Sequence, residues 1–158
     1  MLRSLVFAAV LATAAPAAWA EPAPPPPADS GIIRRASAFS VDETVARLKA
    51  DVAAKNIKFF AEIDQSELGK AANVPLRRSV LIQFGNPPLG LQFLTASPYA
   101  GLDWPVRMLV FEDADGKVWI AWTDFDWIAR RHHIENRAAQ FKMASEVAAS
   151  IAHSAEAP

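Results

Sequence analysis

The chain has 158 residues, with 16 Lys or Arg and 17 Asp or Glu, so its net charge at pH 7 is −1. A near-neutral chain without a basic stripe does not fit nucleic-acid binding, which depends on neutralising phosphates. The absence of Cys excludes disulfides, thiolate nucleophiles and cysteine-based zinc or iron–sulfur sites. We expect no metal site and no cofactor.

The first twenty residues are typical of a secretory signal peptide. Arg3 provides the positive start, residues 5–15 form a short apolar run, and residues 18–20 (Ala-Trp-Ala) form a small-x-small cleavage site. Cleavage near Ala20 would place the protein in the periplasm or outside the cell. The apolar run is shorter than the roughly 20 residues that a membrane span needs, which disfavours a retained anchor, and no later segment predicts a span.

Residues 21–31 form a Pro-rich linker, with four consecutive prolines at 24–27. Such a run favours extended polyproline II structure and does not join a packed core. A spacer is the simpler interpretation, and a proline-motif ligand for a partner is the alternative. Residues 32–158 have the length of a single domain with its own hydrophobic core.

The first half of this domain predicts two strands and two helices. Residues 32–39 and 57–63 are strand-like, and Ile57, Phe59, Ala61 and Ile63 are expected on one face of the second. Ser40 and Glu43 form a capping box before a helix at 41–55, whose apolar side chains recur at helical spacing. Asp64 can cap a short helix at 65–73.

The second half begins with a buried strand at 80–84, ended by Gly-Asn-Pro-Pro, and a short helix at 89–96. Strands at 106–112 and 117–123 are joined by a turn with Gly116, which indicates a hairpin. Asp124 can cap a helix at 125–133, and a longer helix is expected at about 135–153. Consecutive strands in a hairpin favour an α+β fold, an antiparallel sheet with helices on one face.

These features together resemble a known family. The quoted pattern consists of the capping-box helix, the strand ending at Asp64, the corner Phe84-Gly85-Asn86-Pro87, then Gly90, Asp103 and Pro105, and the Asp-Gly-Lys hairpin at 115–117. It resembles the bacterial and archaeal domain of unknown function 302 over about residues 37–145. The resemblance implies a curved antiparallel sheet backed by helices, sometimes as a dimer, and it brings no reaction, cofactor or catalytic residues. Members often have Leu-Pro where this chain has Asp103-Trp104-Pro105.

Four residues are candidates for a ligand site or an interface. Asn86 offers an amide at the end of a strand, although Gly-Asn-Pro-Pro is also an ordinary turn. Asp103 is the best candidate for a functional acid if it is buried. Trp104 and Trp119 are each about as well explained by an exposed binding surface as by the core.

Other residues carry weaker signals. Asp64 and Asp124 are better explained as helix caps than as acids. His132 and His133 point in different directions on a helix, so the favoured interpretation is surface histidines beside Arg130 and Arg131, and contact with an anion or acidic partner is the alternative.

The sequence contains no nucleophile elbow, phosphate-binding loop or metalloprotease motif. The leading hypothesis is therefore an exported, non-catalytic module that binds a small ligand, a protein or a second copy of itself near Asn86, Asp103, Trp104 and Trp119. The alternative is a small hydrolase or isomerase that uses Asp103 with Asn86 as its polar partner.

Overall fold

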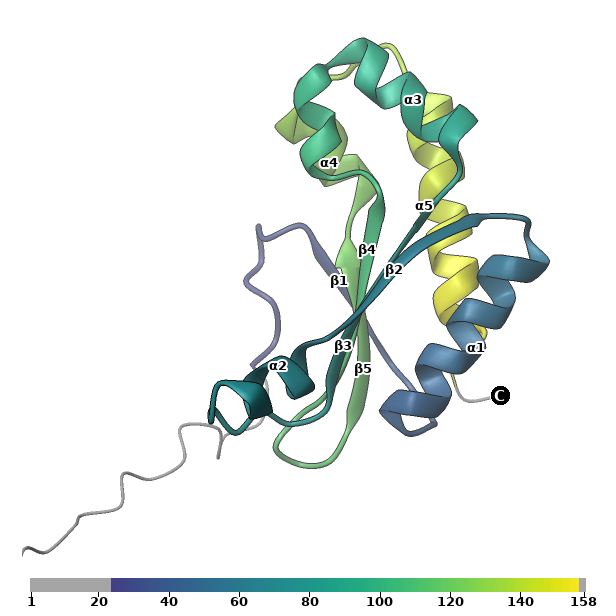
Figure 1. Cartoon of the computed structure of the whole chain (residues 1–158). Coiled ribbons are helices and arrows are strands. Elements are labelled where there is room, and N and C mark those ends of the chain that lie inside the picture. The colour runs from purple at the N-terminus through teal and green to yellow at the C-terminus, as the bar shows by residue number, and fades with distance from the viewer. Residues whose placement is uncertain (1–23, 157–158) are drawn as a thin grey trace, which may run out of the picture.

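The structure, a computed structural model, describes residues 24–156. The predicted signal peptide and its cleavage site lie outside the described residues. Within residues 24–156 the strands form one antiparallel sheet in the order β1-β5-β4-β3-β2 (Figure 1). The strands are β1 (Ile32–Ala36), β2 (Lys58–Asp64), β3 (Ser79–Gly85), β4 (Val106–Glu112) and β5 (Val118–Thr123).

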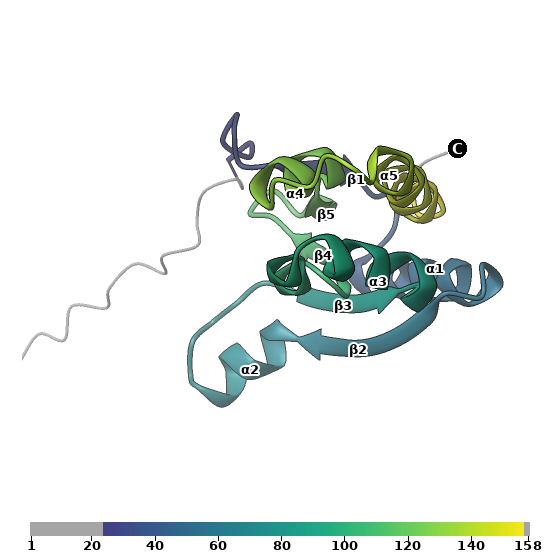
Figure 2. The ribbon, with the colours of Figure 1, turned by 90° about the horizontal axis from the view of Figure 1, so that it is seen from above.

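The helices are α1 (Val41–Ala54), α2 (Gln65–Ala71), α3 (Pro87–Ala96), the 3-10 helix η1 (Pro98–Leu102), α4 (Phe125–Arg131) and α5 (Ala138–His153). Helices α1 and α5 cover one face of this sheet, α3 and α4 lie beyond one of its ends, and α2 lies at the opposite end (Figure 1). Figure 2 shows α1 and α5 on the same side of the sheet. The sheet is open and curved, so the predicted α+β class is confirmed. No helix within residues 24–156 is long and apolar enough to cross a membrane.

Alternation along the central strands places the core on the helix-covered face. The buried side chains of this face belong to alternate residues of three neighbouring strands, among them Val80, Ile82, Phe84, Met108, Val110, Ile120 and Trp122. The intervening side chains, such as Leu81, Leu109 and Trp119, are only half-buried on the other face. We call this second face the open face.

Helix α1 begins as predicted. The Ser40 hydroxyl accepts a hydrogen bond from the Glu43 amide, and Val41, Val45, Leu48 and Val52 are buried. The Glu43 side chain pairs with Arg47 at 2.9 Å. Asn56, just after the helix, has the expected left-handed backbone (φ 53°).

The predicted faces of the second strand are wrong because β2 contains a bulge. Phe59 is paired with Phe84, but Ala61 is paired with Gln83, so Phe60 is an extra residue. A bulge shifts the alternation of side chains by one. Phe59 therefore lies on the helix side of the sheet, while Ala61 and Ile63 belong to the open face.

Other predicted boundaries need smaller corrections. The first strand ends at Ala36 rather than at residue 39, and the last helix starts at Ala138 rather than near 135. Helix α4 ends at Arg131, two residues before the predicted end, and η1 had not been expected. The segment between α4 and α5 contains His133 with a positive φ of 52°, which ends the helical path.

The described part of the Pro-rich linker contacts the domain. The Pro24 carbonyl accepts a hydrogen bond from Arg34 at 3.3 Å, and the Trp127 indole donates to the Asp29 carbonyl at 3.3 Å. At Gly31 an added Cβ would lie 2.3 Å from the Trp127 ring. The residues before β1 thus lie against β1 and α4, closer than a free spacer would.

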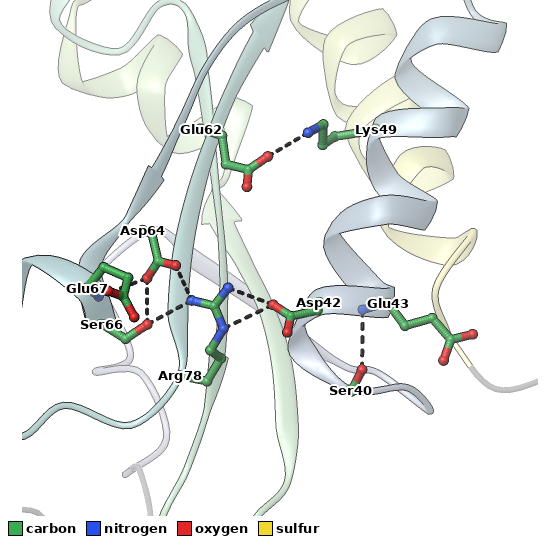
Figure 3. A network of polar contacts seen from close by, with 9 residues as sticks. All are labelled: Ser40, Asp42, Glu43, Lys49, Glu62, Asp64, Ser66, Glu67 and Arg78. Carbon is green, nitrogen blue, oxygen red and sulfur yellow. Dashed lines mark hydrogen bonds and ion pairs between the residues drawn. The ribbon is translucent and has the colours of Figure 1, made fainter.

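A polar network joins α1 to the far end of β2 (Figure 3). Arg78 contacts the carboxylates of Asp42, at the start of α1, and Asp64, at the end of β2. Asp64 also accepts hydrogen bonds from the Ser66 hydroxyl and the Glu67 amide, so it caps α2 as predicted. One guanidinium thereby connects the first helix, the β2 edge and the start of β3.

Candidate functional site

A cleft of about 570 Å³ lies between α3, α5 and the ends of β3 and β4. We call it the α3–α5 cleft. Its walls are mainly apolar and come from Ile57, Phe84, Leu89, Phe93, Trp104, Val106, Phe125, Met143, Ala144, Val147 and Ala148. The polar side chains of the lining are Lys55, Asn86, Gln92 and Gln140. Lys55 is paired with Asp51 at 2.5 Å, so its charge is already compensated.

Trp104 forms one wall of the cleft because two glycines leave room for its ring. A Cβ added to Gly90 would lie 2.1 Å from the Trp104 Nε1, and one added to Gly85 would lie 2.9 Å from the same atom. Phe60, the bulged residue of β2, meets the indole edge-on at 5.6 Å between ring centroids. The Trp104–Pro105 peptide bond is cis.

Asn86 also lines the cleft, and its side chain begins helix α3. The Asn86 Oδ1 accepts a hydrogen bond from the Leu89 amide at 3.2 Å, with Pro87 in the first turn of the helix. Asparagine before proline is a favourable start for a helix. Asn86 therefore acts as the N-cap of α3, in agreement with the interpretation of Gly-Asn-Pro-Pro as a turn. Because Asn86 also lines the cleft, its side-chain amide would lie near a bound molecule.

Asp103 is buried away from the cleft lining, among basic side chains. Its side chain is 4% exposed and contacts Arg107 at 3.3 Å, Arg131 at 3.1 Å and His132 at 2.6 Å. Asp103 follows η1, whereas Arg131 is the last residue of α4 and His132 follows it, so the carboxylate connects two segments far apart in the sequence. A buried carboxylate needs such partners, because an unpaired buried charge is costly.

The surface interpretation of the histidines is wrong for His132. Its side chain is 5% exposed and its Nε2 contacts Asp103, whereas His133 is exposed. No sequence pattern predicts the contact of His132 with Asp103, because the two residues are 29 positions apart. Within residues 24–156 no group of three His, Asp or Glu side chains can hold a metal ion.

Trp119 belongs to the open face and not to the cleft. Arg34 lies 3.8 Å and Lys117 4.3 Å from its ring centroid, and its indole N–H donates to Asp113 at 2.6 Å. That hydrogen bond, followed by those from the Lys117 and Asp115 amides, lowers the pKa of Asp113 against the effect of its burial. Trp119 thus reinforces the β4–β5 turn.

The four sequence candidates therefore fall into three places. Asn86 and Trp104 share the cleft, Asp103 joins η1 to α4, and Trp119 lies on the open face. Within the described residues, the hydrogen bonds of Asp103 and Asn86 lead to different partners. Sequence reasoning missed Phe93, Met143 and Val147 as cleft residues.

The fold and the sequence both match known proteins. The model of the family described as Domain of unknown function DUF302 matches residues 33–156. A crystal structure titled as an uncharacterized conserved protein DUF302 from Bacillus stearothermophilus superposes with a TM-score of 0.73 at 12% identity. It covers 80% of this chain and 99% of that one, which shows a shared fold.

Curated relatives bear a different name. A protein called fluoride-specific ion channel FluC 1 from Brucella suis biovar 1 is 37% identical over 106 residues, which are 67% of this chain and 42% of that protein. A protein of the same name from Brucella abortus biovar 1 is also 37% identical over 106 residues, covering 39% of its length. The chain therefore spans about two-fifths of the length of these relatives.

Proposed function

The chain belongs to the family described as Domain of unknown function DUF302, and we propose that it is a non-catalytic module that binds a small, mainly apolar molecule in the α3–α5 cleft. The observation that carries the proposal is the cleft itself, whose aromatic wall depends on Gly85 and Gly90. Its volume of about 570 Å³ falls in the range of roughly 300–1,000 Å³ that is usual for small-molecule sites.

The lining favours a neutral ligand with an apolar body. Phe84, Phe93 and Trp104 offer aromatic surface, while the amides of Asn86 and Gln140 provide donors and acceptors that can orient a polar end. The cleft has no nucleophile beside a general base, which is why we propose binding instead of a reaction.

The names of the curated relatives suggest fluoride as a second ligand to consider. A small anion needs several hydrogen-bond donors or unpaired cations, whereas the only charged side chain of the cleft lining, Lys55, is paired with Asp51. The chemistry of the cleft thus supports an apolar molecule over fluoride, and sodium fluoride is a suitable comparison ligand in the experiment below.

We also propose that the protein acts outside the cytoplasm, on the basis of the signal-like residues 1–20. Intact-mass measurement on protein recovered from the periplasm of an expressing bacterium tests this directly. The expected mass corresponds to a chain that starts at Glu21. A full-length chain confined to the cytoplasm would contradict the proposal without bearing on the cleft.

Titration with N-phenyl-1-naphthylamine, an uncharged fluorophore whose emission rises in apolar surroundings, tests binding in the cleft. The lip residue Ala139 is exposed and lines the cleft, so Ala139→Trp should fill part of the space and weaken binding at least about tenfold. Ala149→Trp is the matched control, because Ala149 is exposed on α5 outside the cleft lining.

Equal binding by both variants and wild type would place the probe elsewhere and contradict the proposal, as would no binding at all. Competition by sodium fluoride at constant ionic strength would favour an anion site instead. A homodimer stays a prediction, which native mass spectrometry of the same samples addresses.

A further inference from the structure

One end of the molecule presents a long uncharged stretch. The 19 residues from Phe84 to Leu102 contain no Asp, Glu, Lys or Arg. They comprise the end of β3, α3 and η1, and the two helices lie at the top of Figure 1. Several of their large apolar side chains are exposed, with Tyr99 at 72% and Leu102 at 64%. Isolated exposed apolar residues are common, but two neighbours on one short element form a patch.

Tyr99 and Leu102 point the same way. Residues three apart in a 3-10 helix lie one above the other, because this helix has three residues per turn. Ala100, between them, is buried and anchors the inner side of η1. The tyrosine and the leucine therefore project together from the outer side of η1.

Two arginines lie beside these side chains. Arg107 donates to the Leu102 carbonyl at 2.8 Å, which fixes its guanidinium at the edge of η1. Arg131 reaches the same region through Asp103, which it contacts at 3.1 Å. The single carboxylate of Asp103 faces both half-exposed guanidinium groups, so these three side chains together carry one net positive charge.

We propose that Tyr99, Leu102, Arg107 and Arg131, here named the η1 patch, dock the protein on the surface of a bilayer that contains anionic phospholipids. Tyrosine suits the bilayer interface because its ring is apolar and its hydroxyl is polar. Leucine can enter the acyl boundary, and guanidinium groups can pair with lipid phosphates. The proposal does not depend on the α3–α5 cleft being occupied.

Co-sedimentation with vesicles tests this proposal. One set contains phosphatidylcholine alone, and the other contains roughly one-third phosphatidylglycerol to supply negative charge. The wild-type chain should bind the anionic vesicles more strongly, and added salt should weaken that binding because the attraction is partly electrostatic. All variants carry the same N-terminus, so differences among them report on the substituted positions.

Leu102→Ser and Arg107→Gln should each weaken binding to anionic vesicles at least about threefold. Leu68→Ser and Arg77→Gln are matched controls: Leu68 is 61% exposed on α2, and Arg77 follows it, at the opposite end of the molecule. Leu102→Trp should strengthen binding, which keeps the test decisive if a weakened variant proves unstable in thermal unfolding.

Equal weakening by Leu68→Ser and Leu102→Ser would show non-specific adsorption and overturn the proposal. So would binding that is the same for neutral and anionic vesicles, or unchanged by Leu102→Trp. Absence of vesicle binding would also overturn the proposal, and a protein partner would then be the alternative occupant of the η1 patch. None of these results bears on fluorophore binding in the cleft, so the two proposals fail separately.

Discussion

Asp103 contacts three basic side chains while almost completely removed from solvent. An intact buried cluster of this kind contributes little to the free energy of unfolding, because the cost of desolvation offsets the attraction between the charges. Removal of the Asp103 carboxylate should destabilise the fold. The half-exposed arginines can turn to water, but the buried His132 side chain would lose its partner. The contacts of Asp103 therefore hold η1 against the end of α4.

We expect Asp103→Ala to lower the free energy of unfolding by about 3 kcal/mol, the usual cost of removing one partner from a buried charged cluster. Urea unfolding followed by tryptophan fluorescence measures this. Asp115→Ala, at an exposed position in the hairpin turn, should change the same quantity by less than about 0.5 kcal/mol. Similar losses for the two variants would mean that the cluster does not join η1 to α4 energetically.

Helix α3 depends on a glycine for its position against Trp104. The close approach of Gly90 to the indole leaves no volume for a side chain, and the neighbouring strand end has the same restriction at Gly85. A side chain added at Gly90 would therefore force α3 or Trp104 to move.

Gly90→Ala should lower the free energy of unfolding by about 1–3 kcal/mol, because its Cβ would fall 2.1 Å from the Trp104 Nε1. Gly101→Ala is the control, since its Cβ would meet only Leu94 at 3.9 Å, an ordinary contact. Thermal unfolding monitored by circular dichroism compares them. A Gly90 variant as stable as the Gly101 variant would show that Trp104 is not fixed by α3.

Local signals in the sequence predicted most elements and one part of the cleft. Ser40 and Glu43 predicted the start of α1, and the alternating strands predicted the buried face, since both depend on neighbours along the chain. The bulge at Phe60 and the contact of Asp103 with His132 were not predictable in this way. Both are set by segments that meet only after folding, so no periodicity or spacing reports them.

At low pH the free energy of unfolding of the whole molecule should fall in a way that depends on the network around Arg78. The Ser66 hydroxyl, then the Glu67 amide and the Arg78 guanidinium, lower the pKa of Asp64 from its ordinary 3.8 to about 2, against the opposing effect of burial. Because the pKa is lower in the folded state, the stabilisation is complete above about pH 4 and is lost as the pH falls through 2.

Wild type should therefore lose about 1–2 kcal/mol of unfolding free energy between pH 4 and pH 2 beyond the loss seen in Asp64→Asn. Urea unfolding at a series of pH values measures both. Glu67→Gln is the control, because that carboxylate is largely exposed and pairs only with Lys70 at 3.6 Å. Parallel pH profiles for wild type and Asp64→Asn would contradict this role of the network.

The pairing of β1 with β5 has a consequence for the order of folding. Ile32 is opposite Thr123, and the Ser37 hydroxyl donates to the carbonyl of Ala155. The first strand thus has no partner strand until β5, which ends at residue 123 of 158, has been made. Contacts of such long range form slowly. In a chain truncated before β5, the strand β1 would lack the partner strand that it has in the complete sheet. The first strand of the domain is therefore among the last to find its place in the sheet.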